Sequence, residues 1–375
     1  MALRVGLVAR CLNTEHIRGM GKYVFELIRQ STPRHGLEWV LFGDDARYGM
    51  AAPTEKPVVN DIFAFKGDRF HLWEQLGLPL RTIRRNIDVL HCTEGTMSWW
   101  QPKPTVVTVH DTLSWDERPD TPVAAFYYEH LLPAAMKKSA AIITISESSR
   151  VDILARWPWL ESKLSVIPHG IESAYFTQDA GTIPEDLRAG IGGAPYIVYL
   201  GGPLERKRFS WALEVLARTE HRSLQLVACG FGSDARRIAA TKLPAGLQSR
   251  VHFANFLSDS ELRALYRGAR AVLYPTLYEG FGFPAVEAQA AGVPVIFSAL
   301  GSLKELIGPL ALIVPPDDMD AWLAALTQAI TLGERRAERA GAALQWATQF
   351  SWSESFEKHL AVYQRAAKGA AKAPP

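Results

Sequence analysis

Residues 272–287 read VLYPTLYEGFGFPAVE, and this stretch decides the fold. Its first three residues are apolar, as expected for a short strand buried on both faces of a sheet. Gly280 and Gly282 then interrupt regular structure, and Pro284 suits the first turn of a helix. The stretch therefore predicts a strand, a glycine-rich loop and a helix, which is the repeating unit of a parallel α/β sheet.

Similar apolar runs recur along the whole chain. The other expected strands are 3–9, 39–42, 89–91, 106–110, 142–145, 164–167, 196–200, 224–229, 251–253, 293–297 and 311–314. Helical patterns separate most of them, and two capping boxes, Ser258 with Glu261 and Ser302 with Glu305, predict helix starts. This alternation predicts α/β domains with parallel sheets covered by helices on both faces.

The chain is too long for one core. It has 375 residues, whereas single hydrophobic cores rarely exceed roughly 250–300 residues. The segment 173–194 is rich in glycine, proline and polar residues and is interpreted as a linker. We therefore expect two doubly wound, Rossmann-like domains, 1–180 and 190–350, with a helix at about 353–367 packing back on the first. Ligands bind at the carboxyl ends of parallel strands, so both sheets are expected to line a central cleft.

Composition excludes several classes of protein. Hydrophobic residues make up 48% and charged residues 21%, and 41 basic against 39 acidic residues leave a net charge of +2. A disordered chain, a multi-span membrane protein and a dedicated nucleic-acid binder do not fit these values. The three cysteines, Cys11, Cys92 and Cys229, are too scattered for a disulfide framework or a zinc site. With no signal-peptide pattern and no long apolar run, a cytoplasmic protein is expected.

Two glutamates flank the glycine-rich loop. Glu279 is expected on the loop, and Glu287 on the helix that follows it. The unhindered N–H groups of the glycines can approach an oxygen-rich ligand near a helix N-terminus, and the carboxylates can accept hydrogen bonds from hydroxyls. An isolated pair of glutamates is more often a surface residue and a cap. The glycines between them favour a binding site.

A second candidate site follows the strand 196–200. Residues 200–208 read LGGPLERKR, so a buried strand runs into glycines and then three cations. Arg206 offers a bidentate fork and Lys207 a point charge, both suited to phosphate. Three cations in a row usually form a solvated loop. Here they follow the first strand of the second domain, where a phosphate ligand is expected.

Two further motifs lie in the first half of the chain. His110 ends an expected strand, where an ordinary structural histidine is as frequent as a functional one. Gly19 and Gly21 follow the first strand, and Gly-x-Gly is weak evidence for approach to a phosphate. No third glycine stands near Glu26, so the dinucleotide fingerprint is incomplete, which counts against a nicotinamide enzyme.

Together these motifs resemble family 4 of the retaining glycosyltransferases, which have the GT-B fold. The matching stretches are 109–111, 142–150, 166–170, 200–207, 279–287 and 301–305. The likeness covers nearly the whole chain, and bacterial mannosyltransferases of surface polysaccharide assembly resemble it in particular. Two positions depart from the family pattern. His169 stands where asparagine is expected, and Asn255 stands where glycine is common, which leaves the contacts to the base open.

The resemblance implies a role for each candidate residue. Glu287 would accept hydrogen bonds from the donor ribose, and Glu279 would hold hydroxyls of the transferred sugar. Arg206 and Lys207 would neutralise the diphosphate, and His110 would contact the sugar beside the reacting carbon. The other donor-binding residues that the resemblance implies are Gly19, Gly21, Gly202, Gly230, Asn255, Gly280, Phe281, Gly282 and Phe283.

The expected function is retaining transfer of a hexosyl group from a nucleotide sugar, GDP-mannose first, to a glycan or lipid-linked acceptor. No cofactor and no metal are expected, because the cations can stabilise the leaving group and Asp318 and Asp320 are better explained by a helix cap. A UDP-sugar donor, an epimerase or phosphorylase of the same fold, and a non-catalytic sugar-nucleotide binding module are the alternatives. No nucleic-acid partner is expected.

Membrane contact stays open at this stage. Residues 78–89 interleave three arginines with leucines and isoleucines, as in a basic helix that touches anionic lipid at the inner face of a membrane. The same pattern is more often a helix with one face in the core and one in water.

Overall fold

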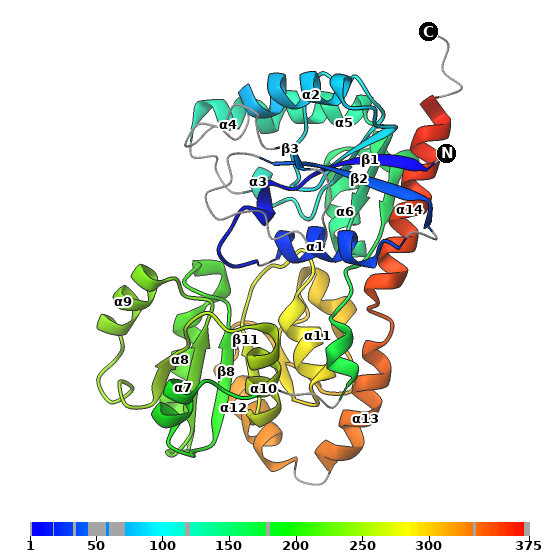
Figure 1. Ribbon diagram of the computed structural model, residues 1–375. Coiled ribbons are helices and arrows are strands. Elements are labelled where there is room, and N and C mark those ends of the chain that lie inside the picture. The colour runs from blue at the N-terminus through cyan, green and yellow to red at the C-terminus, as the bar shows by residue number, and fades with distance from the viewer. Residues whose placement is uncertain are drawn as a thin grey trace. The chain divides into compact units, whose positions relative to one another are not determined.

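The computed structural model describes residues 2–17, 19–32, 35–43, 58–59, 72–116, 121–177, 181–332 and 335–370. The chain divides into two compact units. Unit 1 comprises Met1–Gly170 and Trp352–Pro375, and unit 2 comprises Ile171–Ser351 (Figure 1). Each unit is built on its own parallel sheet.

Unit 1 contains a seven-stranded parallel sheet in the order β3-β2-β1-β4-β5-β6-β7. The strands are β1 (Leu3–Val8), β2 (Leu37–Phe42), β3 (Val58–Val59), β4 (Val89–Cys92), β5 (Thr105–Thr108), β6 (Ala141–Thr144) and β7 (Leu164–Val166). The helices are α1 (Met20–Gln30), α2 (Leu78–Arg84), α3 (Leu113–Asp116), α4 (Pro122–Phe126), α5 (Leu132–Lys138), α6 (Glu147–Arg156) and α14 (Trp352–Ala370). Strands β4 and β5 are buried along their whole length, because helices cover both faces of the sheet.

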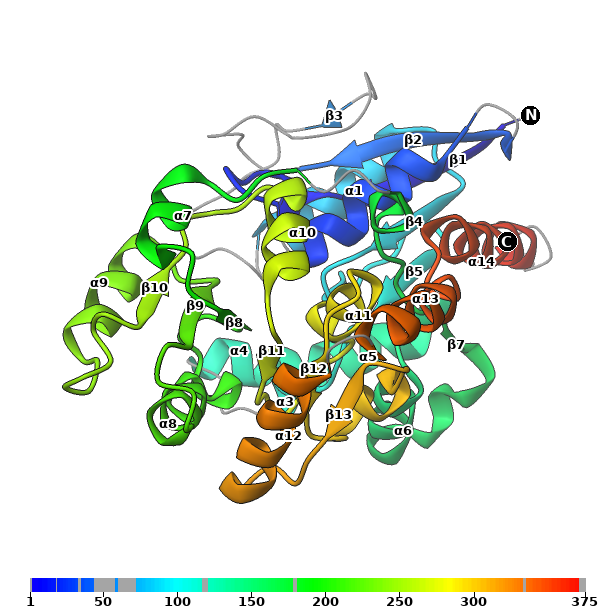
Figure 2. The same cartoon turned by 90° about the horizontal axis from the view of Figure 1, so that it is seen from below.

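Unit 2 contains a six-stranded parallel sheet in the order β10-β9-β8-β11-β12-β13 (Figure 2). Its strands are β8 (Tyr196–Leu200), β9 (Gln225–Cys229), β10 (Val251–Phe253), β11 (Val272–Tyr274), β12 (Val295–Phe297) and β13 (Ala311–Ile313). Its helices are α7 (Glu185–Ile191), α8 (Phe209–Arg218), α9 (Ser233–Thr241), α10 (Asp259–Gly268), α11 (Phe283–Ala290), α12 (Met319–Thr331) and α13 (Arg335–Ala347). A large apolar cluster that includes Leu226, Leu273 and Trp322 fills the space between sheet and helices.

Helix α14 joins unit 1 through a buried chain of hydrogen bonds. His359 Nδ1 lies 2.7 Å from the carbonyl oxygen of Ser355, which can only accept, so Nδ1 carries the hydrogen and Nε2 accepts from the Tyr23 hydroxyl at 2.8 Å. The chain continues through Thr108, which lies 2.9 Å from the Tyr23 oxygen and 2.8 Å from His91 Nε2. The Tyr363 hydroxyl closes it at His91 Nδ1, also at 2.8 Å. Burial lowers the pKa of both histidines, which are therefore neutral.

The structure contains all twelve strands that the sequence predicted, and adds β3, which is too short to give a pattern. The linker interpretation of 173–194 was wrong. This segment forms a 3-10 helix, Ser173–Phe176, and α7, and it belongs to unit 2. A buried ion pair of 2.6 Å between Glu172 and Arg263 fixes its start on α10.

Candidate active site

The predicted residues of unit 2 follow four neighbouring strands. Residues 201–208 follow β8, Gly230 follows β9, Asn255 follows β10, and Glu279 lies on the loop after β11. These strands are adjacent in the sheet and parallel, so all four segments lie at its carboxyl edge.

The loops after β8 and β9 touch backbone to backbone. The amide of Gly202 donates to the carbonyl oxygen of Cys229 at 3.2 Å. Gly202 and Gly230 have φ angles of +67° and +91°, which only glycine adopts readily. A Cβ atom on Gly202 would lie 2.5 Å from the Gly230 carbonyl oxygen, so neither a side chain nor an ordinary backbone conformation fits there.

Two cations and one carboxylate lie together at the carboxyl end of β11. Lys207 Nζ makes a direct ion pair with one oxygen of Glu279, and the Arg206 guanidinium lies 3.7 Å from the other oxygen. Arg206 also donates to the carbonyl oxygen of Tyr278 at 2.8 Å. Burial, and then the charge of Glu279, raises the pKa of the Tyr274 hydroxyl. The backbone amide of Leu277 also donates to the carbonyl oxygen of Arg206 at 3.0 Å, so the loops after β8 and β11 are joined by an ion pair and by a backbone hydrogen bond.

A serine that the sequence predicted as a helix cap instead holds the glycine-rich loop. The Ser302 hydroxyl lies 2.6 Å from the Glu279 carbonyl oxygen and 2.8 Å from that of Phe281. The predicted capping box of Ser302 was therefore wrong, and the residue lies inside a 3-10 helix, Gly301–Leu306. The Ser258–Glu261 box, in contrast, was confirmed at the start of α10.

Helix α11 begins at this loop, as expected. Its N-cap is Gly282, with φ +108° and no side-chain cap, and Pro284 lies in its first turn. The predicted placement of Glu279 on the loop and Glu287 on the helix was confirmed. The loop residues Gly280 and Phe281 and the first helical residue Phe283 lie at the N-terminus of α11, where the helix dipole favours an oxygen ligand.

Glu287 lies in a pocket of buried tyrosines. It is buried on α11, and its charge, after burial itself, raises the pKa of the Tyr175 and Tyr266 hydroxyls. These tyrosines come from the 3-10 helix after β7 and from α10, far from Glu287 in the sequence. Sequence reasoning missed them because no local pattern indicates a phenol that packs against a distant carboxylate.

Asn255 has partners within unit 2. Its amide oxygen accepts a hydrogen bond from Arg236, and its amide nitrogen donates to Asp186 at 3.3 Å. Phe256 beside it is 41% exposed. The side chain of Asn255 is therefore engaged by α9 and α7. The ring of Phe256, in contrast, is exposed.

His110 lies in unit 1, immediately after β5. Its Nε2 donates to the carbonyl oxygen of Thr93 at 2.8 Å, so Nε2 carries the hydrogen. Burial lowers the pKa of the imidazole more than the bond to Thr93 and the charge of Asp111 raise it. His110 is therefore neutral near pH 7, with Nδ1 as a hydrogen-bond acceptor.

Aromatic rings surround His110. The Tyr23 ring meets it edge-on with 5.4 Å between centroids, and the His169 ring lies at 5.7 Å. His169, which replaces the expected asparagine, also packs against Trp352 of α14 at 5.3 Å. The departure from the family pattern thus contributes a buried ring to the wall around His110.

Gly19 and Gly21 form the start of α1 after β1. Gly19 is the N-cap with φ +42° and no side-chain cap. A Cβ atom on Gly21 would lie 3.1 Å from the Cys11 carbonyl oxygen, which explains the second glycine. Arg18 lies outside the described residues.

Two other predicted features can now be placed. Asp318 caps α12 by accepting from the Ala321 amide at 2.9 Å, so the helix-cap interpretation was confirmed. The amphipathic segment 78–89 begins with α2, where Leu80 and Ile83 are 44% and 51% exposed rather than packed in the core. Among the described residues, no helix is long and apolar enough to cross a membrane.

Comparison with known proteins covers both units. The model of the family described as "Glycosyltransferase Family 4" matches residues 17–175. The model described as "Glycosyl transferases group 1" matches residues 188–346.

Curated relatives are moderately similar. The MMP alpha-(1->4)-mannosyltransferase of Mycolicibacterium hassiacum is 29% identical over 70% of this chain and 66% of its own length. The O-antigen chain mannosyltransferase B of Escherichia coli is 26% identical over 64% of each protein. This chain thus spans slightly less than two thirds of these mannosyltransferases. A D-inositol 3-phosphate glycosyltransferase of Corynebacterium urealyticum is 26% identical over 93% of this chain and 88% of its own length.

Solved structures share the whole architecture. WaaG, a glycosyltransferase involved in lipopolysaccharide biosynthesis, superposes with a TM-score of 0.74 and 18% identity over 96% of this chain and 99% of its own. Anabaena HepE in complex with UDP and glucose superposes with a TM-score of 0.71 and 17% identity, over 99% of this chain and 100% of its own. At such identities the likeness shows the fold alone, and it confirms the expected GT-B fold.

Proposed function

Because the chain belongs to glycosyltransferase family 4, we propose that it transfers a hexosyl group from a nucleotide sugar to a glycan or lipid-linked acceptor. The transfer retains the anomeric configuration. The preferred donor is GDP-mannose, and a UDP-sugar is the alternative.

The cluster of Lys207, Arg206 and Glu279 carries this proposal. It lies at the carboxyl edge of the sheet of unit 2, beside the loop that leads into the N-terminus of α11. Two cations held by one carboxylate are preorganised for an anionic leaving group. Glu279 stays within reach of the same ligand, where its oxygens can accept hydrogen bonds from sugar hydroxyls.

The proposed chemical step is a substitution at the anomeric carbon of the transferred sugar. The bond between the anomeric carbon and the diphosphate oxygen breaks, and a bond to the acceptor hydroxyl oxygen forms on the same face of the sugar. The acceptor proton passes to the departing phosphate oxygen. Lys207 and Arg206 stabilise the charge that grows there, which makes the transfer independent of a metal.

His110 orients the sugar in this proposal. Its Nε2 hydrogen is committed to Thr93, so Nδ1 can accept a hydrogen bond from a sugar hydroxyl. The expected cleft between the two sheets, in which Gly19 and Gly21 would close on the diphosphate, stays a prediction.

The donor preference rests on the relatives. The first curated matches are named mannosyltransferases. HepE, in contrast, was solved with UDP and glucose, which supports the alternative donor.

Thermal unfolding with GDP, UDP, ADP and CMP, each with EDTA, tests the donor class. A ligand at about 100 times its dissociation constant stabilises a folded protein by about 2.7 kcal/mol. We expect GDP to give the largest shift in midpoint, and GDP-mannose then to be turned over. A shift with UDP alone would overturn the donor preference but keep the enzyme. No shift with any nucleotide, in a protein that unfolds cooperatively, would contradict the glycosyltransferase proposal.

We also propose that the protein is cytoplasmic and touches the inner face of the membrane through the surface of α2. The preceding turn and α2 expose Leu76, Leu80 and Ile83 beside Arg81 and Arg84. Apolar side chains flanked by arginines favour an anionic bilayer surface.

Sedimentation with vesicles tests this contact. Vesicles of phosphatidylcholine with phosphatidylglycerol should retain the protein, and Leu80→Ser/Ile83→Ser should abolish retention while the fold persists. Equal retention of wild type and variant would contradict the assignment.

A further inference from the structure

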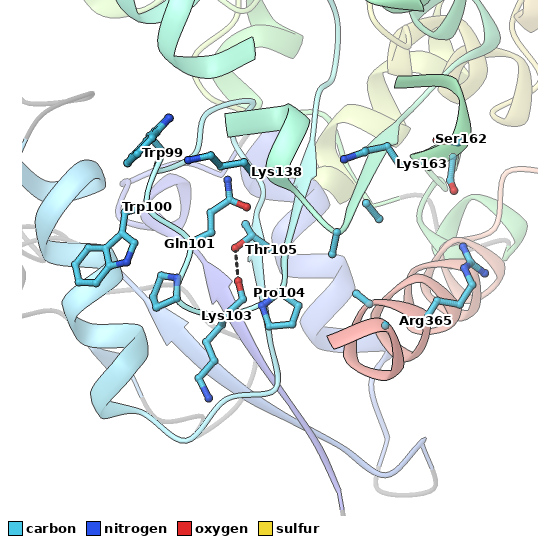
Figure 3. A pocket seen from close by; sticks show the side chains of 16 residues that line it. Trp99, Trp100, Gln101, Lys103, Pro104, Thr105, Lys138, Ser162, Lys163 and Arg365 are labelled. Atoms are coloured by element: carbon cyan, nitrogen blue, oxygen red, sulfur yellow. Dashed lines mark hydrogen bonds between the residues drawn. The ribbon is translucent and has the colours of Figure 1, made fainter. Parts of the chain in front are cut away.

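Unit 1 has a hollow at the edge of its sheet that is opposite to the edge where His110 lies. It has a volume of about 880 Å³ and is lined by the start of β5, β6 and β7 and by the end of α14. Figure 3 shows Trp99 and Trp100 on one side of it and Arg365 on the opposite side, with Lys138 and Lys163 between them.

The lining of this hollow is strongly basic. It includes Lys103, Lys138, Lys163 and Arg365, and none of its residues is acidic. Two of the lysines are engaged. Lys163 donates to the carbonyl oxygens of Lys137 and Ser139, both at 2.8 Å, at the end of α5.

The other engaged lysine is Lys138, whose Nζ lies 3.2 Å from the centre of the Trp99 ring. Lys103 and Arg365 make no ion pair within the described part of the chain. Lys103 is half-buried and Arg365 is exposed, and both line the hollow, so their charges are accessible to an anionic ligand.

Two neighbouring indoles complete the wall. Trp99 and Trp100 are 47% and 42% exposed, whereas tryptophan is mostly buried in folded proteins. Adjacent exposed indole rings mark a contact surface, and their flat faces suit the C–H faces of sugar rings. Aromatic rings beside free cations thus match a ligand that is both carbohydrate and anion.

The hollow is separate from the candidate active site. Thr105 lines it at the start of β5, and His110 follows the end of the same strand. Five residues of extended chain span about 16 Å. A small ligand in the hollow therefore does not reach His110.

We propose that this hollow binds an anionic glycan, a sugar chain that bears carboxylate or phosphate groups. Trp100 stacks on a sugar ring, and Trp99, whose ring is covered on one face by Lys138, borders it. Lys103 and Arg365 pair with the acidic groups. The site does not depend on the proposed transfer reaction, so loss of transfer leaves its test intact.

Calorimetric titration with oligogalacturonate, a chain of uronic acids, tests the site. We expect binding that weakens with salt, and no binding of neutral dextran oligosaccharides. Lys103→Glu/Arg365→Glu should weaken oligogalacturonate binding about tenfold or more, because two attractions become repulsions. The matched control is Lys242→Glu/Lys304→Glu, which changes the net charge equally at two exposed residues of unit 2 and should bind as wild type does.

Two further arms separate the sources of the anion. Inorganic phosphate, which offers charge without a sugar ring, should bind weakly to the wild type. Trp100→Ala should weaken oligogalacturonate binding but leave phosphate binding unchanged. Wild type and Lys103→Glu/Arg365→Glu should sediment equally with vesicles of phosphatidylcholine and phosphatidylglycerol. Loss of vesicle binding without loss of oligogalacturonate binding would assign the hollow to lipid. Equal oligogalacturonate affinity of both double variants, or none in wild type at low salt, would overturn the proposal.

Discussion

At the scale of single residues, Glu279 is the partner that keeps Lys207 and Arg206 in place before any ligand binds. Partly buried charges need partners, and removing one leaves the others uncompensated. The sequence identified all three residues, because each lies in a glycine-rich or basic motif. It did not identify Ser302 or Tyr266, whose roles arise only when distant segments pack together.

Lys207→Met tests the cluster directly. The variant loses the charge that we propose stabilises the leaving group, so transfer should fall by about 100-fold or more. Lys207→Arg should retain part of the activity, since the charge persists. The measurement is turnover of the donor identified by thermal unfolding, with circular dichroism as the check on folding. Lys242→Met, which removes the same charge from the end of α9, serves as control. A folded Lys207→Met protein with near-normal turnover would refute the phosphate assignment.

At the scale of elements, the order of strands and helices followed from apolar runs and caps, since a buried parallel strand needs an uninterrupted apolar sequence. The segment 173–194 was wrongly predicted as a linker, because glycine and proline are frequent in turns inside a domain as well as in linkers. Gly192, for example, ends α7 in the left-handed conformation. The approach of the loops after β8 and β9 was invisible in sequence, because it joins residues from two strands.

Gly202→Ala tests that approach. A methyl group there meets the Gly230 carbonyl oxygen, and φ +67° is strained for alanine. The free energy of unfolding should fall by about 1–3 kcal/mol, and nucleotide binding should weaken with it. Gly232→Ala is the matched control on the next loop, where φ is −68° and the space is open. Because Gly232 is the N-cap of α9, alanine there should lower the free energy of unfolding, measured with urea, by less than about 1 kcal/mol. Equal effects of the two substitutions would contradict the packing argument.

The hydrogen-bond chain of α14 predicts sensitivity to acid. Burial lowers the pKa of His359 from its ordinary value to about 4. The unfolded chain takes up this proton below about pH 6.5, whereas the folded protein does so only near pH 4. The stabilisation is therefore complete above pH 6.5 and is lost as the pH falls toward 4, by up to about 3 kcal/mol for this residue.

Urea unfolding at pH 7.5, 6.0 and 5.0 measures this loss. His359→Gln should reduce the pH dependence but not abolish it, because burial also lowers the pKa of His91 and of His110, which remain in the variant. His130→Gln, at an exposed histidine, should keep the slope of wild type. A wild-type protein of constant stability across this range would contradict the neutral, buried assignment.

At the scale of the whole molecule, the residues proposed to bind the nucleotide and the hollow proposed to bind a glycan belong to different units. Hydrogen exchange with and without the preferred nucleotide should therefore show protection in peptides that contain residues 201–208 and 278–287. Peptides that contain residues 99–105 should exchange unchanged. Protection confined to residues 99–105 would contradict the placement of the nucleotide on unit 2.

The return of the chain to unit 1 has a consequence for how the protein is made. The strands of unit 2 are contiguous in the sequence, whereas α14 supplies Tyr363 and His359 to the interior of unit 1 only after unit 2 is complete. On the ribosome, folding generally proceeds from the N-terminus. Here the first half to emerge must wait for a helix synthesised after the second half. Until that helix arrives, the nascent chain exposes part of an unfinished interior, and chaperones have a defined interval in which to act.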